Sequence, residues 1–360
     1  MKPSAPQQSW TRRAAMIPHV ALDEAILSVI RTRQPKTPTL AEAERTVAEM
    51  ASASELFEER GWVDRPATYH RQPPPLRDDD ILELRSRTRP LRHQTLTFPS
   101  GFRPRLVEPG AERWLSNQRN ETVLVRLLRH QQTNAPWVIC LHGFGMGSSR
   151  FDLATLWATY LHAKLGFNVA LPVAPLHGSR RSADDGQLLS LDLTSMLHGI
   201  SQAVWDVRRL VSWLRSATGT PIGVYGLSLG GYLAALLAGI EELDCVVAAL
   251  PFANVLGLME HHGPPPMYLD VLGSDPAQNT FRVTSPLAMQ PQLPPERLTL
   301  FAARGDRLIP QDQTHALSAR WQSPHDHWIN SGHVGFTWSR EAKRLVGEQL
   351  SAGLCSSIQH

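Results

Sequence analysis

A serine near the middle of the chain has the sequence context of a nucleophile. The stretch Gly226-Leu227-Ser228-Leu229-Gly230 matches the pattern G-x-S-x-G, which marks a sharp strand-to-helix turn that presents a serine hydroxyl above a sheet. The flanks agree with this, because residues 222–225 are strand formers and residues 232–238 continue as a helix. The same pentapeptide also occurs in ordinary turns, so the case for catalysis depends on partners elsewhere in the chain.

The two residue types that activate a serine follow in the order aspartate, histidine. Asp306 comes directly after a strand-like run at 297–303, and His333 lies in a glycine-containing loop further along the chain. A histidine takes the proton of the serine, and a carboxylate orients the imidazole and stabilises its charged form. We therefore predict Ser228, Asp306 and His333 as the catalytic residues, with Asp312 as the reserve candidate for the acid.

A glycine-rich loop, His142-Gly143-Phe144-Gly145-Met146-Gly147, follows an apolar run at 136–141. A nucleotide site fits this loop poorly, because it lacks the third glycine of a dinucleotide fingerprint and the Gly-Lys-Ser/Thr of a phosphate loop. An oxyanion loop fits better: the backbone N–H groups of Phe144 and Leu229 would donate hydrogen bonds to the developing negative oxygen. A purely structural turn is the alternative.

Four residues near strand ends are expected to contact the substrate: His142, Gly143, His177 and Arg180. The loop that carries His177 and Arg180 follows an apolar run at 167–173, and α/β sheets bind their ligands at the carboxyl ends of the strands. Arg180 could bind an anionic part of a substrate or could instead fix its own loop through an ion pair.

The histidines do not indicate a metal site. His177 has no second ligand at a useful spacing, and the stretch His325-Asp326-His327 has no further ligand spaced to join it. We expect neither a metal ion nor an organic cofactor.

The motifs at 142–145 and 226–231 together make the chain resemble the α/β-hydrolase superfamily, in its esterase, thioesterase and serine-peptidase-like branch. The resemblance covers roughly residues 94–352. It implies an α/β fold with a mostly parallel central sheet and helices on both faces, and it implies the chain order Ser228, Asp306, His333 for the catalytic residues. Haloalkane dehalogenases and epoxide hydrolases of this superfamily have an aspartate where this chain has Ser228, so the serine disfavours those activities.

The remaining sequence supplies the elements that must position these residues. Strand-like runs lie at 94–98, 122–128, 136–141, 167–173, 243–252, 297–303 and 327–329, and apolar residues recur at helical spacing over 200–214. The segment 253–295 is rich in proline and is predicted to be irregular. It is either a cap or lid that shapes an apolar acyl pocket, or a segment that packs against the body.

The first quarter of the chain differs from the rest. Its composition predicts helices at 21–30 and 40–57 followed by a proline-rich stretch at 71–75. We expect an N-terminal helical extension and linker over 1–90, then a catalytic domain over 91–355. The arginines within 85–92 could bind phosphate, but the acidic residues just before them offset their charge, which favours a solvated linker.

Composition excludes several classes of protein. With 360 residues, 42% of them hydrophobic, the chain can fill a sizeable core, and a net charge of +3 does not indicate a nucleic-acid-binding surface. Charged residues and a proline interrupt the N-terminal apolar run, so no signal peptide forms, and no apolar run is long enough to span a bilayer. The three cysteines form no C-x-x-C pair. We expect a cytoplasmic protein without an integral membrane segment; the sequence does not indicate its oligomeric state.

These observations predict a serine hydrolase that cleaves an ester, thioester or related acyl bond of a small-molecule substrate through a Ser-His-Asp triad and an acyl-enzyme intermediate. Two alternatives stay open at this point. One is a serine peptidase or amidase on the same fold, and the other is a non-catalytic binding or scaffold protein.

Overall fold

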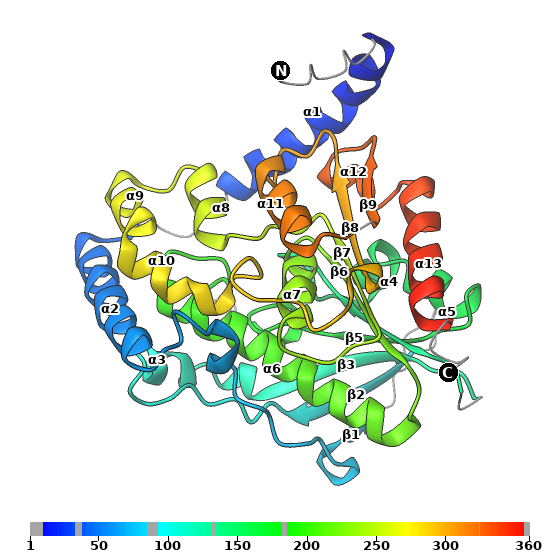
Figure 1. The fold of residues 1–360 in the computed structure, drawn as a ribbon, viewed down its shortest axis with the longest axis horizontal. Coiled ribbons are helices and arrows are strands. Elements are labelled where there is room, and N and C mark those ends of the chain that lie inside the picture. The colour runs from blue at the N-terminus through cyan, green and yellow to red at the C-terminus, as the bar shows by residue number, and fades with distance from the viewer. Residues whose placement is uncertain are drawn as a thin grey trace.

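One mixed β-sheet forms the centre of the molecule. The computed structural model describes residues 10–32, 38–84, 93–131, 134–181, 186–323 and 325–355. Within these ranges the strands form a nine-stranded sheet in the order β1-β2-β3-β5-β4-β6-β7-β8-β9 (Figure 1). The strands are β1 (Leu82–Leu84), β2 (Gln94–Pro99), β3 (Thr122–Leu128), β4 (Trp137–Leu141), β5 (Asn168–Pro172), β6 (Ile222–Leu227), β7 (Cys245–Ala249), β8 (Leu298–Ala303) and β9 (His325–Ile329).

The sheet is antiparallel at one edge and parallel over the rest. The pairs β1–β2, β2–β3 and β3–β5 are antiparallel, whereas every pair from β5 through β4, β6, β7 and β8 to β9 is parallel. The strand-like runs of the sequence all became strands, and β1 is an additional strand that the sequence analysis did not predict. The parallel strands place their carboxyl ends at one edge of the sheet, where the loops with the predicted catalytic residues emerge.

Helices cover both faces of the sheet. On one face lie α6 (Leu193–Thr218) and α7 (Leu229–Ala238), and on the other lie α4 (Ser149–Thr155), α5 (Ala158–Ala163) and α13 (Arg340–Cys355) (Figure 1). Along β4 the buried side chains alternate between these two layers: Ile139 packs with the first and Val138 and Cys140 with the second. A strand covered on both faces is apolar at successive positions, which explains the continuous apolar run of this segment.

The segment predicted to be irregular, 253–295, is helical over more than half of its length. It contains α8 (Val255–His261), α9 (Pro266–Gly273) and α10 (Asp275–Phe281). The residues that suggested loops begin these helices instead. Asn254 and Ser274 cap α8 and α10, and Pro266 is the first residue of α9, where a missing N–H costs nothing. Three further α-helices of the body are α3 (Ala111–Leu115), α11 (Gln311–Trp321) and α12 (His333–Phe336).

Two long helices precede the sheet, α1 (Trp10–Thr32) and α2 (Leu40–Glu59). The first begins well before the predicted 21–30, ends two residues after it, and contains a proline in its interior. The two helices lie at different places: α2 runs beside α9 and α10, whereas α1 contacts α12 and lies along the top of the view in Figure 1. The arginines within 85–92, and with them the predicted boundary between 90 and 91, lie outside the described residues.

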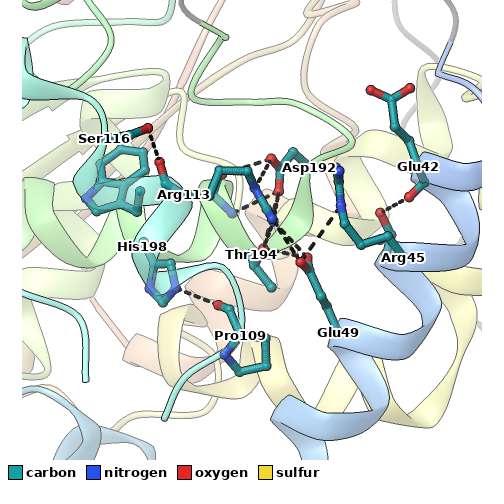
Figure 2. A network of polar contacts seen from close by, with 12 residues as sticks. Glu42, Arg45, Glu49, Pro109, Arg113, Ser116, Asp192, Thr194 and His198 are labelled. Atoms are coloured by element: carbon teal, nitrogen blue, oxygen red, sulfur yellow. Dashed lines mark hydrogen bonds and ion pairs between the residues drawn. The ribbon is translucent and has the colours of Figure 1, made fainter. Parts of the chain in front are cut away.

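An ion-pair network fixes α2 to the body of the molecule. Figure 2 shows Arg113 of α3 between the carboxylates of Glu49 on α2 and Asp192 at the start of α6. The Arg113 guanidinium donates to Glu49 at 2.9 and 2.8 Å and to Asp192 at 2.9 and 3.0 Å. Thr194 also donates to Glu49, at 2.8 Å. Bidentate pairs of this kind fix orientation as well as distance, so α2 is held in one register against α3 and α6.

The described helices do not include one that combines the length and the apolar composition needed to cross a lipid bilayer.

Candidate active site

Ser228 occupies a strained turn between β6 and α7. Its backbone has φ 57° and ψ −115°, a conformation that costs free energy for a residue other than glycine. A Cβ atom on Gly230 would overlap the carbonyl oxygen of Leu141, so only glycine lets α7 pass this close to β4. The Ser228 side chain makes no capping hydrogen bond to α7. The turn therefore leaves the hydroxyl available at the carboxyl end of β6, as the G-x-S-x-G pattern predicts.

Asp306 is fixed in the turn that follows β8. One carboxylate oxygen, Oδ1, accepts the backbone N–H groups of Leu308 at 2.8 Å and Ile309 at 2.9 Å. The other, Oδ2, accepts a hydrogen bond from Nδ1 of His333 at 2.7 Å. The contact predicted between these two side chains is thus present, while the reserve candidate Asp312 is exposed in the first turn of α11.

His333 is buried, with 8% of its surface exposed, and lies at the start of α12. Burial by itself lowers the pKa of the imidazole, but the charge of Asp306, the hydrogen bond to it and the charge of Asp23 outweigh burial and raise that pKa above its ordinary value. With Nδ1–H donated to Asp306, the lone pair of Nε2 is left to accept a proton. A hydrogen bond between this nitrogen and Ser228 stays a prediction.

The glycine-rich loop after β4 runs beside the serine. A Cβ atom placed on Gly143 would lie 3.6 Å from Cβ of Ser228, and the Gly143 N–H contacts the Met146 sulfur at 3.1 Å. Leu229 is the first residue of α7, and the N–H groups of a first helical turn have no partner within the helix. The half-buried Phe144 follows Gly143 directly. Donation by the N–H groups of Phe144 and Leu229 to an oxyanion stays a prediction.

Comparison with known proteins identifies the family. No model of a known protein family matches the chain. A protein of Mycobacterium tuberculosis strain CDC 1551 / Oshkosh, uncharacterized protein MT2702, is 37% identical over 340 residues, which cover 91% of this chain and 80% of that protein. The chain belongs to the same family.

Two solved structures show which fold this family member has. Acetyl xylan esterase 1 from Thermoanaerobacterium sp. JW/SL YS485 is 16% identical, with a TM-score of 0.52 and coverage of 81% of this chain and 93% of that one. Esterase B from Lactobacillus rhamnosis (HN001) is 17% identical, with a TM-score of 0.50 and coverage of 89% and 98%. Similarity at this level of identity concerns the fold. The chain has the α/β-hydrolase fold, as the two glycine-rich motifs predicted.

His142 has both of its ring nitrogens bonded to backbone groups. Its Nδ1–H donates to the carbonyl of Gly143 at 2.9 Å, and its Nε2 accepts the N–H of Ala174 at 3.1 Å. Burial lowers the pKa of this imidazole to about 4, so the ring is neutral near pH 7. These bonds tie the loop after β4 to the loop after β5. Contact of His142 with a substrate stays a prediction.

His177 packs against the predicted oxyanion loop. Its ring lies edge-on to Phe144, with 5.7 Å between ring centroids, and its Nδ1–H donates to the carbonyl of Pro175 at 2.8 Å. Burial and the neighbouring His142 lower its pKa to about 3. Among the described residues Nε2 has no hydrogen-bond partner. Contact of His177 with a substrate stays a prediction.

Arg180 points into the body of the α/β-hydrolase fold. Only 1% of its surface is exposed. Its guanidinium pairs with Asp206 of α6 at 2.9 Å and donates to the carbonyls of Val173 at 2.8 Å and Asn120 at 2.7 Å. Of the two interpretations offered by the sequence, the structure favours the ion pair that fixes the loop over the substrate contact.

No group of three or more histidine, cysteine, aspartate or glutamate side chains in the described ranges is arranged to hold a metal ion. In the stretch His325-Asp326-His327, the His327 ring stacks on Phe301 at 4.7 Å between centroids, and Asp326 accepts a hydrogen bond from Ser318.

One residue beside the site was missed by the sequence analysis. Asp23 of α1 is fully buried, and its carboxylate accepts the backbone N–H of His333 at 2.7 Å. In the sequence it appeared only as a charge that interrupts an apolar run, and no local pattern around it pointed to His333.

Proposed function

We propose that this protein is a serine hydrolase that cleaves an ester, thioester or related acyl bond of a small-molecule substrate. The observation that carries the proposal is the buried pair of Asp306 and His333, joined at 2.7 Å in the loops that follow β8 and β9. Ser228 follows β6 at the same edge of the sheet on a strained turn. Both solved structures compared above are esterases, which supports acyl transfer on this fold.

The proposed reaction uses three side chains and two backbone groups. As Oγ of Ser228 attacks the acyl carbon, Nε2 of His333 takes its proton, and Asp306 stabilises the imidazolium. The N–H groups of Phe144 and Leu229 donate to the oxygen that becomes negative. His333 then gives the proton to the leaving group as its bond to the acyl carbon breaks. Water attacks the acyl serine in the same manner and restores the free hydroxyl.

We propose that the segment 253–295 determines which substrates the protein accepts. This segment lies between β7 and β8, and its first helix, α8, reaches the turn of the proposed acid, because the His262 ring contacts the carbonyl of Leu308 at 2.8 Å. We infer that the catalytic domain spans 91–355 and that α8, α9 and α10 form a cap that shapes the acyl pocket.

The test is labelling with a fluorophosphonate, which reacts with an activated serine whatever the natural substrate is. We expect mass spectrometry to locate the label at Ser228 in the native protein. Ser228→Ala is expected to abolish labelling and to lower the rate of ester hydrolysis by about 10⁴-fold or more with the fold intact. Ser116→Ala is the matched control: Ser116 is exposed and bonded to the carbonyl of Arg113 in α3, so labelling at Ser228 should remain.

A folded protein that takes up no label would contradict the proposal and favour a binding or scaffold role. Where labelling occurs, a panel of acyl esters, thioesters and peptide amides separates the esterase from the peptidase.

A further inference from the structure

One face of α1 covers both turns that carry the proposed acid and base. This helix lies along the top of the view in Figure 1 and contacts α12. Its residues Met16, His19, Val20 and Asp23 recur at helical spacing, so their side chains lie on one face. This face points at residues 305–307 and 332–335, the segments on either side of Asp306 and His333.

The turns are shaped to receive the helix. A Cβ atom on Gly332, directly before His333, would lie 2.8 Å from the Asp23 carboxylate and 2.9 Å from the carbonyl of His19. A Cβ atom on Gly335 would overlap the His19 ring. Glycine at these positions lets the helix backbone approach the loop closely enough for a short carboxylate to reach it.

The Asp23 carboxylate joins the two turns. It is 0% exposed. Its Oδ2 accepts the N–H of His333 at 2.7 Å and the N–H of Arg307 at 3.2 Å, and its Oδ1 accepts the N–H of Val334 at 3.0 Å. Hydrogen bonds to a charged acceptor are stronger than those between neutral groups. A single side chain therefore sets the distance between the loop of Asp306 and the loop of His333.

We propose that Asp23 is a positioning residue of this active site: it holds the loops of Asp306 and His333 in register and stabilises the imidazolium through its charge. This inference rests on the proposed serine hydrolase activity. It makes α1 part of the catalytic apparatus. The sequence analysis predicted this N-terminal extension but assigned it no function. Asp23 acts through His333 and through the backbone and does not touch the substrate.

The charges around His333 determine in which direction its pKa should move when the charge of Asp23 is removed. Asp306 contacts the ring from the acid turn, and Asp23 and His19 face its loop from α1. The Arg307 side chain points outward to Glu24 at 2.8 Å, in a pair that is about half exposed. Burial lowers the pKa of His333, while Asp306 and Asp23 raise it. Removal of the Asp23 charge should therefore lower the pKa of His333.

The experiment compares Asp23→Asn with Glu24→Gln in the full-length protein. Asparagine has the same size but only one acceptor oxygen, so its NH₂ group would face a backbone N–H. We expect the rate of fluorophosphonate labelling at Ser228 to fall roughly 10- to 100-fold, the range for misplaced catalytic groups. The acid limb of the rate–pH profile should also move to lower pH. Glu24→Gln removes one negative charge from the same helix at a half-exposed position and should leave both the labelling rate and the pH profile within about twofold of native.

Three outcomes would overturn the proposed role of Asp23. If Asp23→Asn is folded and keeps both the native labelling rate and the native pH profile, the proposal is overturned while the serine hydrolase stands. If it lowers only thermal stability, with no shift of the acid limb, Asp23 is merely structural and the proposal is also overturned. If the native protein takes up no label, the proposed hydrolase fails first and this inference with it.

A second variant keeps the test decisive if Asp23→Asn does not fold. Asp23→Glu retains the charge but displaces it by one methylene. The proposal predicts a lower labelling rate with the acid limb at its native pH, and a rate equal to the native one would contradict it.

Discussion

At the scale of single residues, the proposed role of Asp306 as the catalytic acid yields the sharpest kinetic prediction. Asp306→Asn keeps the side-chain volume but offers Nδ1 of His333 an N–H donor, which favours the wrong tautomer of the ring. We expect kcat/KM for an ester substrate to fall by about 10⁴-fold, the effect of this change in a Ser-His-Asp triad. Because the imidazole must be neutral to act as a base and its pKa is raised, native activity should fall with decreasing pH through a midpoint above about 6.5.

The matched control for this prediction is Asp312→Asn. Asp312 is exposed in the first turn of α11 and was the reserve candidate for the acid. Steady-state kinetics should show a change of about twofold or less, as for a solvated charge. A large loss in the Asp312 variant with little loss in the Asp306 variant would reverse the assignment of the acid.

The sequence indicated Ser228 and Asp306 but not Asp23, because only the first two lie in recognisable local patterns. Ser228 and Asp306 each lie in a local pattern, a pentapeptide between a strand and a helix and an aspartate directly after a strand. Asp23 has no such pattern, because its partners are backbone groups 284 and 310 positions away in the chain. Only the packing of α1 brings them together.

At the scale of elements, the loop after β5 depends on one buried ion pair. Arg180→Ala would remove the guanidinium that pairs with the buried Asp206 carboxylate, and breaking a buried pair costs about 3–5 kcal/mol in the free energy of unfolding. Urea unfolding should show this loss, while KM of the folded protein for an ester substrate, under the proposed activity, changes little. Arg181→Ala is the control, because Arg181 is the exposed neighbour and its removal should cost about 0.5 kcal/mol or less. Unchanged stability with a raised KM would instead support the substrate contact predicted from the sequence.

Elements were predictable where their own burial pattern was strong. The parallel strands are buried on both faces and read as continuous apolar runs, so β4 and β8 were located to within one residue. The helices α8, α9 and α10 were missed because each has only seven or eight residues, which is too few to establish a 3.6-residue period. Their stability comes from packing against α2 and the body rather than from their own sequences.

At the scale of the whole molecule, the N-terminal extension is attached at two separate places. The helix α1 holds the loops of Asp306 and His333 through Asp23, while α2 shares a hydrophobic core with the sheet through Met50 and Phe57. The ion pairs of Arg113 fix α2 from the side (Figure 2). Because the extension contributes both to the site and to the core, it should unfold together with the sheet.

The substitution Phe57→Ala tests this cooperativity. Phe57 is 0% exposed and packs on Trp62 and Tyr69, with 5.2 Å between ring centroids in each pair. Truncation of a buried phenylalanine costs about 3–5 kcal/mol. We expect the free energy of unfolding of the entire protein to fall by this amount in one transition that coincides by circular dichroism and tryptophan fluorescence. Val47→Ala, on the same helix at a position 52% exposed, should cost about 0.5 kcal/mol or less. An early separate transition, with the main transition unmoved, would show instead that α2 folds as an independent unit and that the extension is a domain of its own.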